Sequence, residues 1–516
     1  MADVRLLILL PVLGALAVLL GPTRAARGLG GVAAGAALLV AIATVLAEPT
    51  AWTFAWVPAL GLQLTIGIDG LAAPGVLVIC LVGQVAAVVR GGTRGAIAGG
   101  LLLQATLLAM VLARDLGLLV GCHALLAPLV ALGVAGGPGS DRLRAGPAAG
   151  LYLALGTAAL AVAAGLLAVA HHDATGGRWE LSYDALTQVL LPRGLELAVG
   201  GLILLAGALT LGLWPLHGWL VAAGAAAPTG PGLLIAGPVR WVGAYLLMRV
   251  WLPLAPGSAA AGALGLGVLA VVGGVVGGLC ARAEADERRA LLLATLTPTG
   301  LVALGLCGQH NEGAIGALVL ATVVALGGAA GLLALAGGAP RRWAGLALVP
   351  APGLAGCVGA ALVLIGTARF TGLTLGGHGW PLAVAGGAAL VLSVRAGREG
   401  HGAEDRHRRT DRWALAGALV LAAPLVALGA WPRPWLARIS ASGRAVVEAA
   451  TLRRCLVAEL GVTEPTRVPA TLGACDEPLR TLTERARAAT VSAEPVADAA
   501  RAVPVEGVEP PAEDAG

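Results

Sequence analysis

The chain has 516 residues, of which 58% are hydrophobic and 12% charged, and its mean hydropathy is +0.86. Several stretches of about 20 residues carry no charge, which is the length that an α-helix needs to cross a bilayer, so a soluble enzyme of this size is excluded. The formal charge of +5 does not indicate nucleic-acid binding, because the arginines are scattered over short loops. We therefore predict an all-α polytopic protein that contacts the lipid bilayer of the cell (inner or plasma) membrane.

The length criterion predicts about fourteen transmembrane helices. They lie near residues 4–21, 28–47, 71–89, 95–113, 116–135, 147–170, 195–213, 232–250, 258–281, 290–307, 314–336, 344–366, 379–396 and 413–431. The first of them resembles a signal peptide in length. No small-residue cleavage site follows it and the apolar pattern continues, so we interpret it as a first span.

The arginines are concentrated in every second connection between these spans. The odd-numbered connections carry Arg24, Arg27, Arg90, Arg94, Arg142, Arg144, Arg282, Arg288, Arg289, Arg341, Arg342, Arg395, Arg398, Arg406, Arg408, Arg409 and Arg412. The even-numbered connections carry only Arg114, Arg178, Arg193 and Arg369. Because basic loops stay on the cytoplasmic side, we predict that both termini lie outside.

Two external connections have patterns of their own. Residues 51–70 alternate in polarity and contain β-formers, which predicts a short hairpin. Residues 171–194 are polar, and we expect one short amphipathic helix near 179–191.

The composition changes after the last span. We expect a transmembrane domain over 1–435 and an extramembrane tail over 436–516. A helix is predicted over 443–460, followed by a Pro-, Glu- and Ala-rich end that buries too little apolar surface to stay folded. Whether Cys455 and Cys475 pair in this tail is left open.

Residues 210–250 contain the most distinctive pattern in the chain. An apolar run ends in Trp-Pro-Leu-His-Gly-Trp-Leu, in which Pro215 cannot donate a backbone hydrogen bond and interrupts the helix. Pro228 and Pro352 mark two further predicted helix breaks. Interrupted helices inside a membrane are tolerated only where protein or a water-filled cavity satisfies the freed backbone, so they often mark transport paths.

This stretch resembles the membrane subunit M (chain 4) of proton-translocating NADH-quinone oxidoreductase, or respiratory complex I. That family carries a block of the form W-P-F-H-T-W-L-P-D-A-H-x-E-A-P-T after its seventh span. The matching residues are Trp214, Pro215, His217, Trp219, Leu220, Ala227, Pro228, Thr229, Ala236, Gly237, Gly243, Tyr245 and Arg249. The resemblance covers roughly 65–435 and implies a fourteen-span, antiporter-like fold with interrupted helices and both termini outside.

The chain departs from the family at the residues that move protons. The family is understood to use a row of intramembrane carboxylates and lysines. Its fifth-span glutamate falls on His123, its seventh-span lysine on Thr210, and its eighth-span lysine on Trp241, beside Arg240. The tenth-, eleventh- and twelfth-span ionisable positions fall on Pro298, Val324 and Ala360. The chain contains no lysine, and arginine does not deprotonate in proteins, so a lysine relay is excluded.

The remaining proton-path candidates are His123, His217, Thr210 and Arg240. Histidine titrates near neutrality, so His123 could shuttle protons, or it could be a hydrogen-bonded structural histidine. For Arg240 we expect backbone carbonyls near the helix break as partners, because no carboxylate is obvious in the sequence. We predict no metal, no cofactor and no catalytic site in this chain.

The resemblance implies a membrane-arm subunit of a proton-translocating NADH-quinone oxidoreductase-type complex, with a degenerate proton path. Its expected partners are other membrane-arm subunits, with quinone as a partner of the complex and no nucleic acid. Because the chain itself holds no redox centre, its standing as an enzyme is left open. The alternatives are a subunit of a cation/proton antiporter or membrane hydrogenase complex, or a non-pumping scaffold of another membrane complex.

Overall fold

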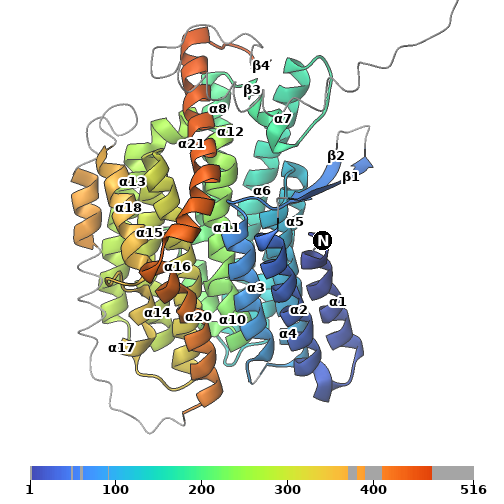
Figure 1. The fold of residues 1–516 in the computed structure, drawn as a ribbon, viewed down its shortest axis with the longest axis vertical. Helices are drawn as coiled ribbons and strands as arrows, with labels where there is room; N and C mark the ends of the chain where they lie inside the picture. Colours follow the sequence, from blue (N-terminus) through green and yellow to red (C-terminus); the bar gives the residue numbers. More distant parts are fainter. Residues whose placement is uncertain are drawn as a thin grey trace, which may run out of the picture. The chain divides into compact units, whose positions relative to one another are not determined.

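The computed structural model describes residues 3–47, 50–57, 62–90, 92–369, 381–389 and 410–467. Residues 1–468 form one compact unit, which is built almost entirely of helices (Figure 1). Residues 469–516 lie outside the described residues. Cys475 is among them, so its pairing with Cys455 stays a prediction.

The helices follow one another along the chain with few strands between them. The α-helices are α1 (Leu6–Leu20), α2 (Ala26–Leu46), α3 (Ala73–Val88), α4 (Arg94–Leu112), α5 (Leu116–Ala135), α6 (Arg142–Ala174), α7 (Tyr183–Thr187), α8 (Arg193–Leu211), α9 (Gly218–Ala226), α10 (Thr229–Ala236), α11 (Pro238–Leu246), α12 (Leu252–Leu254), α13 (Pro256–Ala283), α14 (Glu287–Ala294), α15 (Leu296–Cys307), α16 (Asn311–Ala336), α17 (Arg341–Ala344), α18 (Ala355–Arg369), α20 (Arg412–Ala430) and α21 (Arg433–Leu460). Two 3₁₀ turns, η1 (Thr23–Ala25) and η4 (Leu346–Leu348), and one π-helical turn, η3 (Leu247–Trp251), complete the set. Residues 381–389 are also helical.

Ten helical stretches in the described part of the chain are long and apolar enough to cross a membrane. Three shorter apolar helices, Leu6–Leu20, Ala73–Val88 and Ala355–Ala368, fall on three more of the predicted spans. Of the span expected at 379–396, only 381–389 is described. The all-α polytopic fold is therefore confirmed, and the count of fourteen stays a prediction.

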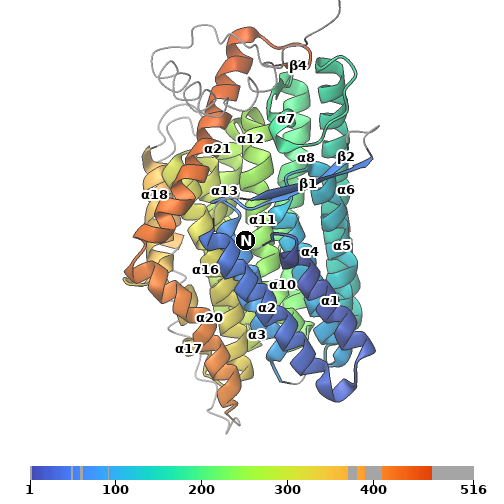
Figure 2. The ribbon, with the colours of Figure 1, turned by 45° about the vertical axis from the view of Figure 1, so that its right-hand side comes forward.

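The predicted hairpin is confirmed, and its external location stays a prediction. β1 (Ala51–Val57) pairs antiparallel with β2 (Leu62–Gly67), with Trp52 opposite Ile66. In Figures 1 and 2 this hairpin lies toward the same end of the unit as α7.

Three details of the connection over 171–194 and of the tail differ from expectation. The helix expected near 179–191 is only α7, which is followed by a strand, β3 (Val189–Leu190). That strand pairs with β4 (Thr466–Arg467), which comes from the segment expected to be disordered. In addition, α21 begins at Arg433 rather than near 443, because Pro434 at the start of a helix needs no hydrogen-bond acceptor.

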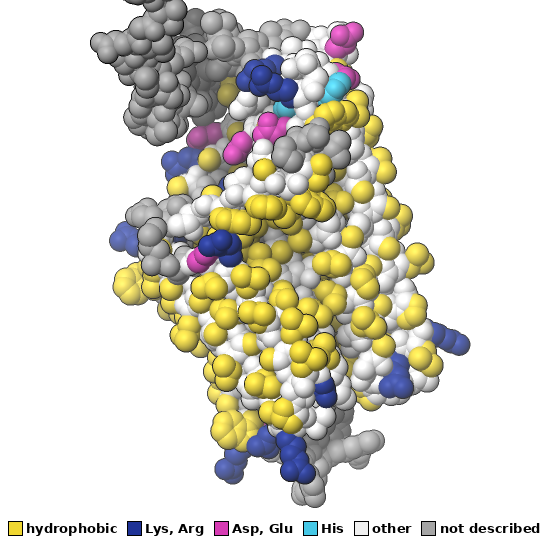
Figure 3. Space-filling model, turned by 90° about the vertical axis from the view of Figure 1, so that its right-hand side faces the viewer, with side chains coloured by type: hydrophobic (Ala, Val, Ile, Leu, Met, Phe, Trp, Pro, Cys, Tyr) yellow, Lys and Arg dark blue, Asp and Glu magenta, His cyan; other side chains and the backbone are white. Residues whose placement is uncertain are grey.

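Contacts between odd-numbered connections agree with the prediction that alternate connections lie at the same end of the unit. At one end of the unit, Asp141 pairs with Arg289 at 3.0 Å, and Arg341 donates to the carbonyl of Glu284 at 3.0 Å. These residues belong to three different odd-numbered connections. Figure 3 shows hydrophobic side chains over the middle of one face, with charged side chains concentrated toward its ends. The gathering of odd-numbered connections at one end agrees with the predicted topology, and which end faces the cytoplasm stays a prediction.

Small residues allow the central helices to pack closely. α16 is buried on nearly all sides, and it packs against α10, α11, α15, α18 and α20. Between α8 and α11 the approach is closest at Gly243, where an added Cβ would lie 2.4 Å from the backbone N of Leu211. Close backbone approach at small residues is how helices associate in lipid, where no hydrophobic effect drives them together.

Substitution of Gly243 with alanine should destabilise the protein, because the new methyl group meets backbone atoms that cannot move aside. We expect a loss of about 1–3 kcal/mol, typical of overpacking, and a lower midpoint of thermal unfolding in detergent. Gly99→Ala on α4 is the matched control, because a Cβ there meets nothing within 4 Å. Equal midpoints for both variants would show that the α8–α11 approach is not tight.

Candidate functional site

Protein groups form hydrogen bonds with the backbone carbonyls that are freed at the break between α8 and α9. α8 ends at Leu211, and Gly212 adopts the left-handed conformation with φ 68°. The backbone N–H of Leu213 donates to the carbonyl of Ala208 at 2.9 Å, and the indole Nε1 of Trp219 donates to the carbonyl of Leu209 at 2.8 Å. These contacts satisfy carbonyls that a helix end otherwise leaves without partners, as an interruption inside a membrane requires.

The structure places the predicted break residues between helices. Pro215 lies between α8 and α9, and Pro228 lies between α9 and α10. Pro352 lies in the turn between η4 and α18, next to Gly353 with φ 85°.

Two further breaks were not predicted from the sequence. One separates α10 from α11 at Gly237, just before Pro238, and the other separates α14 from α15 at Thr295. Near the second break Pro298 has no N–H to donate to the carbonyl of Ala294, which weakens the helix there.

His123 lies at the meeting point of three helices. Its side chain, on α5, is fully buried. Nδ1 is 2.7 Å from Oγ1 of Thr157 on α6, and Nε2 is 2.9 Å from Oγ1 of Thr210 on α8. Thus two of the predicted candidates, His123 and Thr210, are hydrogen-bonded to each other.

The two threonines limit which nitrogens of the His123 ring carry a proton. The hydroxyl of Thr210 is 2.8 Å from the carbonyl of Ala206, and the hydroxyl of Thr157 is 3.0 Å from the carbonyl of Leu153. If both hydroxyls donate to these carbonyls, both ring nitrogens must carry protons. A neutral ring has only one N–H, so one threonine then turns its proton toward the ring. The trio can hold a proton at His123, but it contains no second ionisable group that could accept it.

Arg240, on α11, is also fully buried, and it is held without a carboxylate. Its Nε donates to the carbonyl of Leu211 at 3.1 Å, and one terminal nitrogen donates to Oγ1 of Thr295 at 2.5 Å. The other terminal nitrogen donates to Oγ1 of Thr299. The expected backbone partner is therefore present, and two threonines that the sequence did not single out complete the set.

These side chains form two hydrogen-bonded groups that meet at the end of α8, and together we call them the polar row. It consists of Thr157, His123, Thr210, Arg240, Thr295 and Thr299. Thr210 and Leu211 are neighbours in the last turn of α8, so the same helix end binds His123 on one side and Arg240 on the other. The row therefore crosses α6, α5, α8, α11 and the α14–α15 break.

His217 lies apart from the hydrogen bonds of the row. It precedes α9 and is half-buried, and its Nδ1 has no hydrogen-bond partner among the described residues. The structure does not bring His217 into hydrogen-bond contact with His123, so its part in a proton path stays a prediction.

Comparison with known proteins finds one family that the middle of the chain resembles. The family described as "NADH:quinone oxidoreductase/Mrp antiporter, TM" matches residues 113–343, which include the whole polar row. The likeness to this family covers a little under half of the chain. Chain 4 of a Picosynechococcus NAD(P)H-quinone oxidoreductase is 29% identical over 248 residues, or 47% of this chain and 46% of the relative. Subunit M of the Escherichia coli NADH-quinone oxidoreductase is 28% identical over 252 residues, or 47% of this chain and 49% of the relative.

The chain thus spans about half the length of the curated relatives that it matches. Solved structures extend the likeness of fold to most of the chain. Respiratory complex I from Thermus thermophilus contains a chain with a TM-score of 0.73 and 25% identity, covering 87% of this chain and 100% of that one. The Mrp complex from Dietzia contains a chain with a TM-score of 0.73 and 19% identity, covering 98% of this chain and 58% of that one. The chain is therefore a multi-pass membrane protein with an antiporter-like fold.

The residues of the polar row that sequence reasoning missed are Thr157, Thr295 and Thr299. A local signal existed for two of them, because Thr295-Leu296-Thr297-Pro298-Thr299 sets three hydroxyls around a proline in an apolar run. The family's eighth-span lysine position, Trp241, points elsewhere and donates to Thr322 at 3.2 Å. The guanidinium of the preceding residue, Arg240, is the charged group in the row.

A second charged cluster lies at the end of the unit that carries the hairpin. Oδ2 of Asp69 is 2.6 Å from Arg249 and 3.2 Å from Arg114, and Oδ1 accepts from the backbone N–H of Ala72 at 2.8 Å. Burial by itself would raise the pKa of Asp69, but the charges of Arg249 and then Arg114 hold that pKa below its usual value. Arg249 lies in the π-helical turn η3, so a local irregularity directs its side chain at Asp69.

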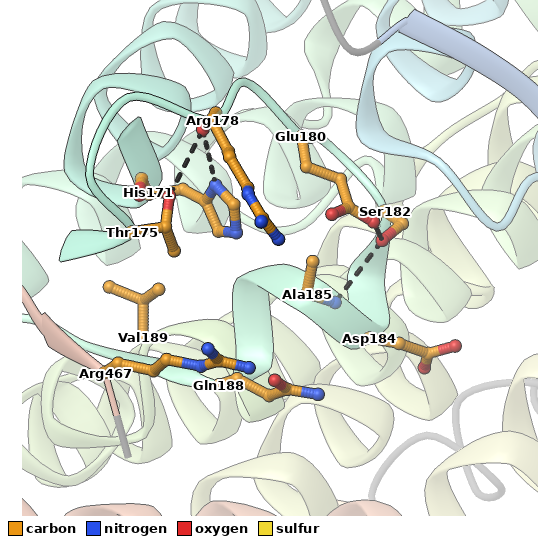
Figure 4. A pocket seen from close by; sticks show the side chains of 10 residues that line it. All are labelled: His171, Thr175, Arg178, Glu180, Ser182, Asp184, Ala185, Gln188, Val189 and Arg467. Atoms are coloured by element: carbon orange, nitrogen blue, oxygen red, sulfur yellow. Dashed lines mark hydrogen bonds between the residues drawn. The ribbon is translucent and has the colours of Figure 1, made fainter. Parts of the chain in front are cut away.

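A polar pocket of about 470 Å³ opens near α7 and β3 (Figure 4). His171 lines it, and its Nδ1 is 3.0 Å from the carbonyl of Arg178. Arg178 and Arg467 contribute guanidinium groups, and Glu180 and Asp184 contribute carboxylates. Because both signs of charge line the pocket, its chemistry selects no single class of ligand. No group of His, Cys, Asp and Glu side chains in the described residues is arranged to hold a metal ion.

Proposed function

We propose that this chain is a membrane-arm subunit of a proton-translocating NADH-quinone oxidoreductase-type complex in the cell membrane, with a degenerate proton path of its own. The observation that carries the proposal is the polar row within the family-matched region. The resemblance carries the family's fifth-span glutamate onto His123 and its seventh-span lysine onto Thr210. Here those two positions are joined by a hydrogen bond of 2.9 Å, so they still meet in the fold although neither carries the charged residue of the family.

The chemistry of the row supports a structural or coupling role. A proton relay needs neighbouring groups whose pKa values can be shifted against each other. The row offers one histidine, four threonine hydroxyls and one arginine, and arginine stays charged. The chain would therefore couple conformational changes of neighbouring subunits or stabilise their packing. Other subunits would move protons and pass electrons to quinone.

Gentle purification of the tagged chain from its native membrane tests the assignment. We expect other membrane-arm subunits of a complex I-like assembly to co-purify, together with the subunits that bind NADH. Co-purification with antiporter subunits alone would instead place the chain in an Mrp-type complex, and a lone soluble partner would indicate a scaffold of a different kind.

A further inference from the structure

We propose that Arg240 is an electrostatic plug, a fixed positive charge that bars protons and other cations from the polar row. The inference rests on the proposed function and assigns a cause to the loss of transport. The missing lysines explain why the row cannot relay protons actively. The missing lysines do not explain what prevents protons and other cations from leaking through a region of interrupted helices and hydroxyl groups.

In the described part of the chain, no acidic side chain offsets the charge of Arg240. Among the described residues, every ion pair joins other groups. The three partners of the guanidinium are a carbonyl and two hydroxyls, which are neutral. Their dipoles hold the cation in place and leave its net charge in the low-dielectric interior, where charges interact far more strongly than in water.

The guanidinium is also fixed in position. The hydroxyl of Thr295 donates to the carbonyl of Leu292 at 2.5 Å, and the hydroxyl of Thr299 donates to the carbonyl of Thr295 at 2.7 Å. Each hydroxyl therefore presents its oxygen to Arg240 and has no free proton. The Leu211 carbonyl lies at the C-terminal end of α8, where the helix dipole favours a cation.

The plug and the one proton-holding group of the row, His123, are bound to neighbouring residues of α8. His123 and Arg240 bind adjacent residues of α8, so a proton that leaves His123 along the row next meets the guanidinium. A lysine at this point could release a proton and become neutral, whereas an arginine cannot. A permanent positive group lining a narrow path is a known way to exclude protons and cations.

The test measures proton flux into vesicles of phosphatidylethanolamine and phosphatidylglycerol that hold the purified full chain and a trapped pH dye, driven by a potassium diffusion potential. We expect wild-type vesicles to match protein-free vesicles. Arg240→Gln, which keeps hydrogen-bond donors and removes the charge, should raise the flux about tenfold or more. Thr299→Asp should raise it similarly, because a carboxylate beside the guanidinium cancels the charge without altering Arg240.

Thr299→Asn is the matched control for Thr299→Asp, since it has the same shape and no charge, and its flux should stay at the wild-type value. The proposal is overturned if correctly folded Thr299→Asp and Arg240→Gln are as tight as wild type, or if Thr299→Asn leaks as much as Thr299→Asp. If the wild-type chain itself conducts protons rapidly, the degenerate path of the proposed function fails together with the plug. If the wild type and both variants all show background proton flux, the proposal about Arg240 fails and the proposed function stands.

Discussion

Substitution of Asp69 with asparagine will strongly destabilise the protein at neutral pH. Asparagine keeps an oxygen that can accept from the backbone N–H of Ala72, so the start of α3 stays capped. It removes the negative charge that lies between Arg249 and Arg114, two partly buried cations. Removing one member of a buried ion pair typically costs about 3–5 kcal/mol, because the remaining charge is left uncompensated.

This loss should depend on pH in a defined direction. The pKa of Asp69 is lower in the folded protein than its usual value, so its ionisation stabilises the fold above the unfolded pKa of about 4. That contribution disappears as the pH falls through the lower, folded pKa. The gap in thermal midpoint between wild type and Asp69→Asn should therefore be constant from about pH 8 to about pH 5 and shrink below about pH 4.

Asp141→Asn is the matched control for Asp69→Asn. Asp141 also pairs with one arginine, Arg289 at 3.0 Å, but its side chain is 72% exposed. Exposed ion pairs contribute about 0–1 kcal/mol, so this variant should unfold close to the wild-type temperature. A small effect of Asp69→Asn, equal to that of Asp141→Asn, would show that the Asp69 cluster is solvated and does not stabilise the fold.

The second large effect is expected at Arg453 on α21. Its side chain is 5% exposed, and its guanidinium donates to the carbonyls of Leu186 and Thr187 at 3.2 Å each and to the carbonyl of Val189. Arg453→Ala removes a donor from each of these carbonyls, at a cost of about 1–3 kcal/mol for each buried group left unpaired. We expect α21 to separate from the α7–β3 segment.

Hydrogen exchange followed by mass spectrometry measures that separation. Peptides from α21 and from α7 should both exchange faster in Arg453→Ala, while peptides from α16 should be unchanged. Arg444→Ala on the same helix is the control, because Arg444 is exposed. Faster exchange spread evenly over the whole chain would contradict a local docking role and indicate general misfolding.

Sequence patterns that act locally were sufficient for much of this fold. Charge-free runs gave most of the spans, because the bilayer imposes their length. Pro215, Pro228 and Pro352 marked breaks since a proline constrains only its own and adjacent residues. Gly237 and Pro238 carried a similar signal, but the apolar run on both sides hid the break within one predicted span.

The polar row was predictable only in part. The resemblance supplied His123 and Thr210, which occupy positions that carry charges in the family. Thr157 and Thr299 could not be found this way, because a threonine in an apolar helix usually bonds its own backbone and gives no sign of a partner on another helix. The pairing of β3 with β4 was not predicted, because it joins segments far apart in the sequence.

We propose that the polar row keeps the architecture of a proton relay without its function. Proton flux through the wild-type chain alone, reconstituted in vesicles and driven by a membrane potential, tests this most directly. We expect a flux equal to that of protein-free vesicles at every pH between about 6 and 8, the range around neutrality. A flux well above that background, lost when His123 is replaced by leucine, would show that a working relay runs through His123 and would contradict the account.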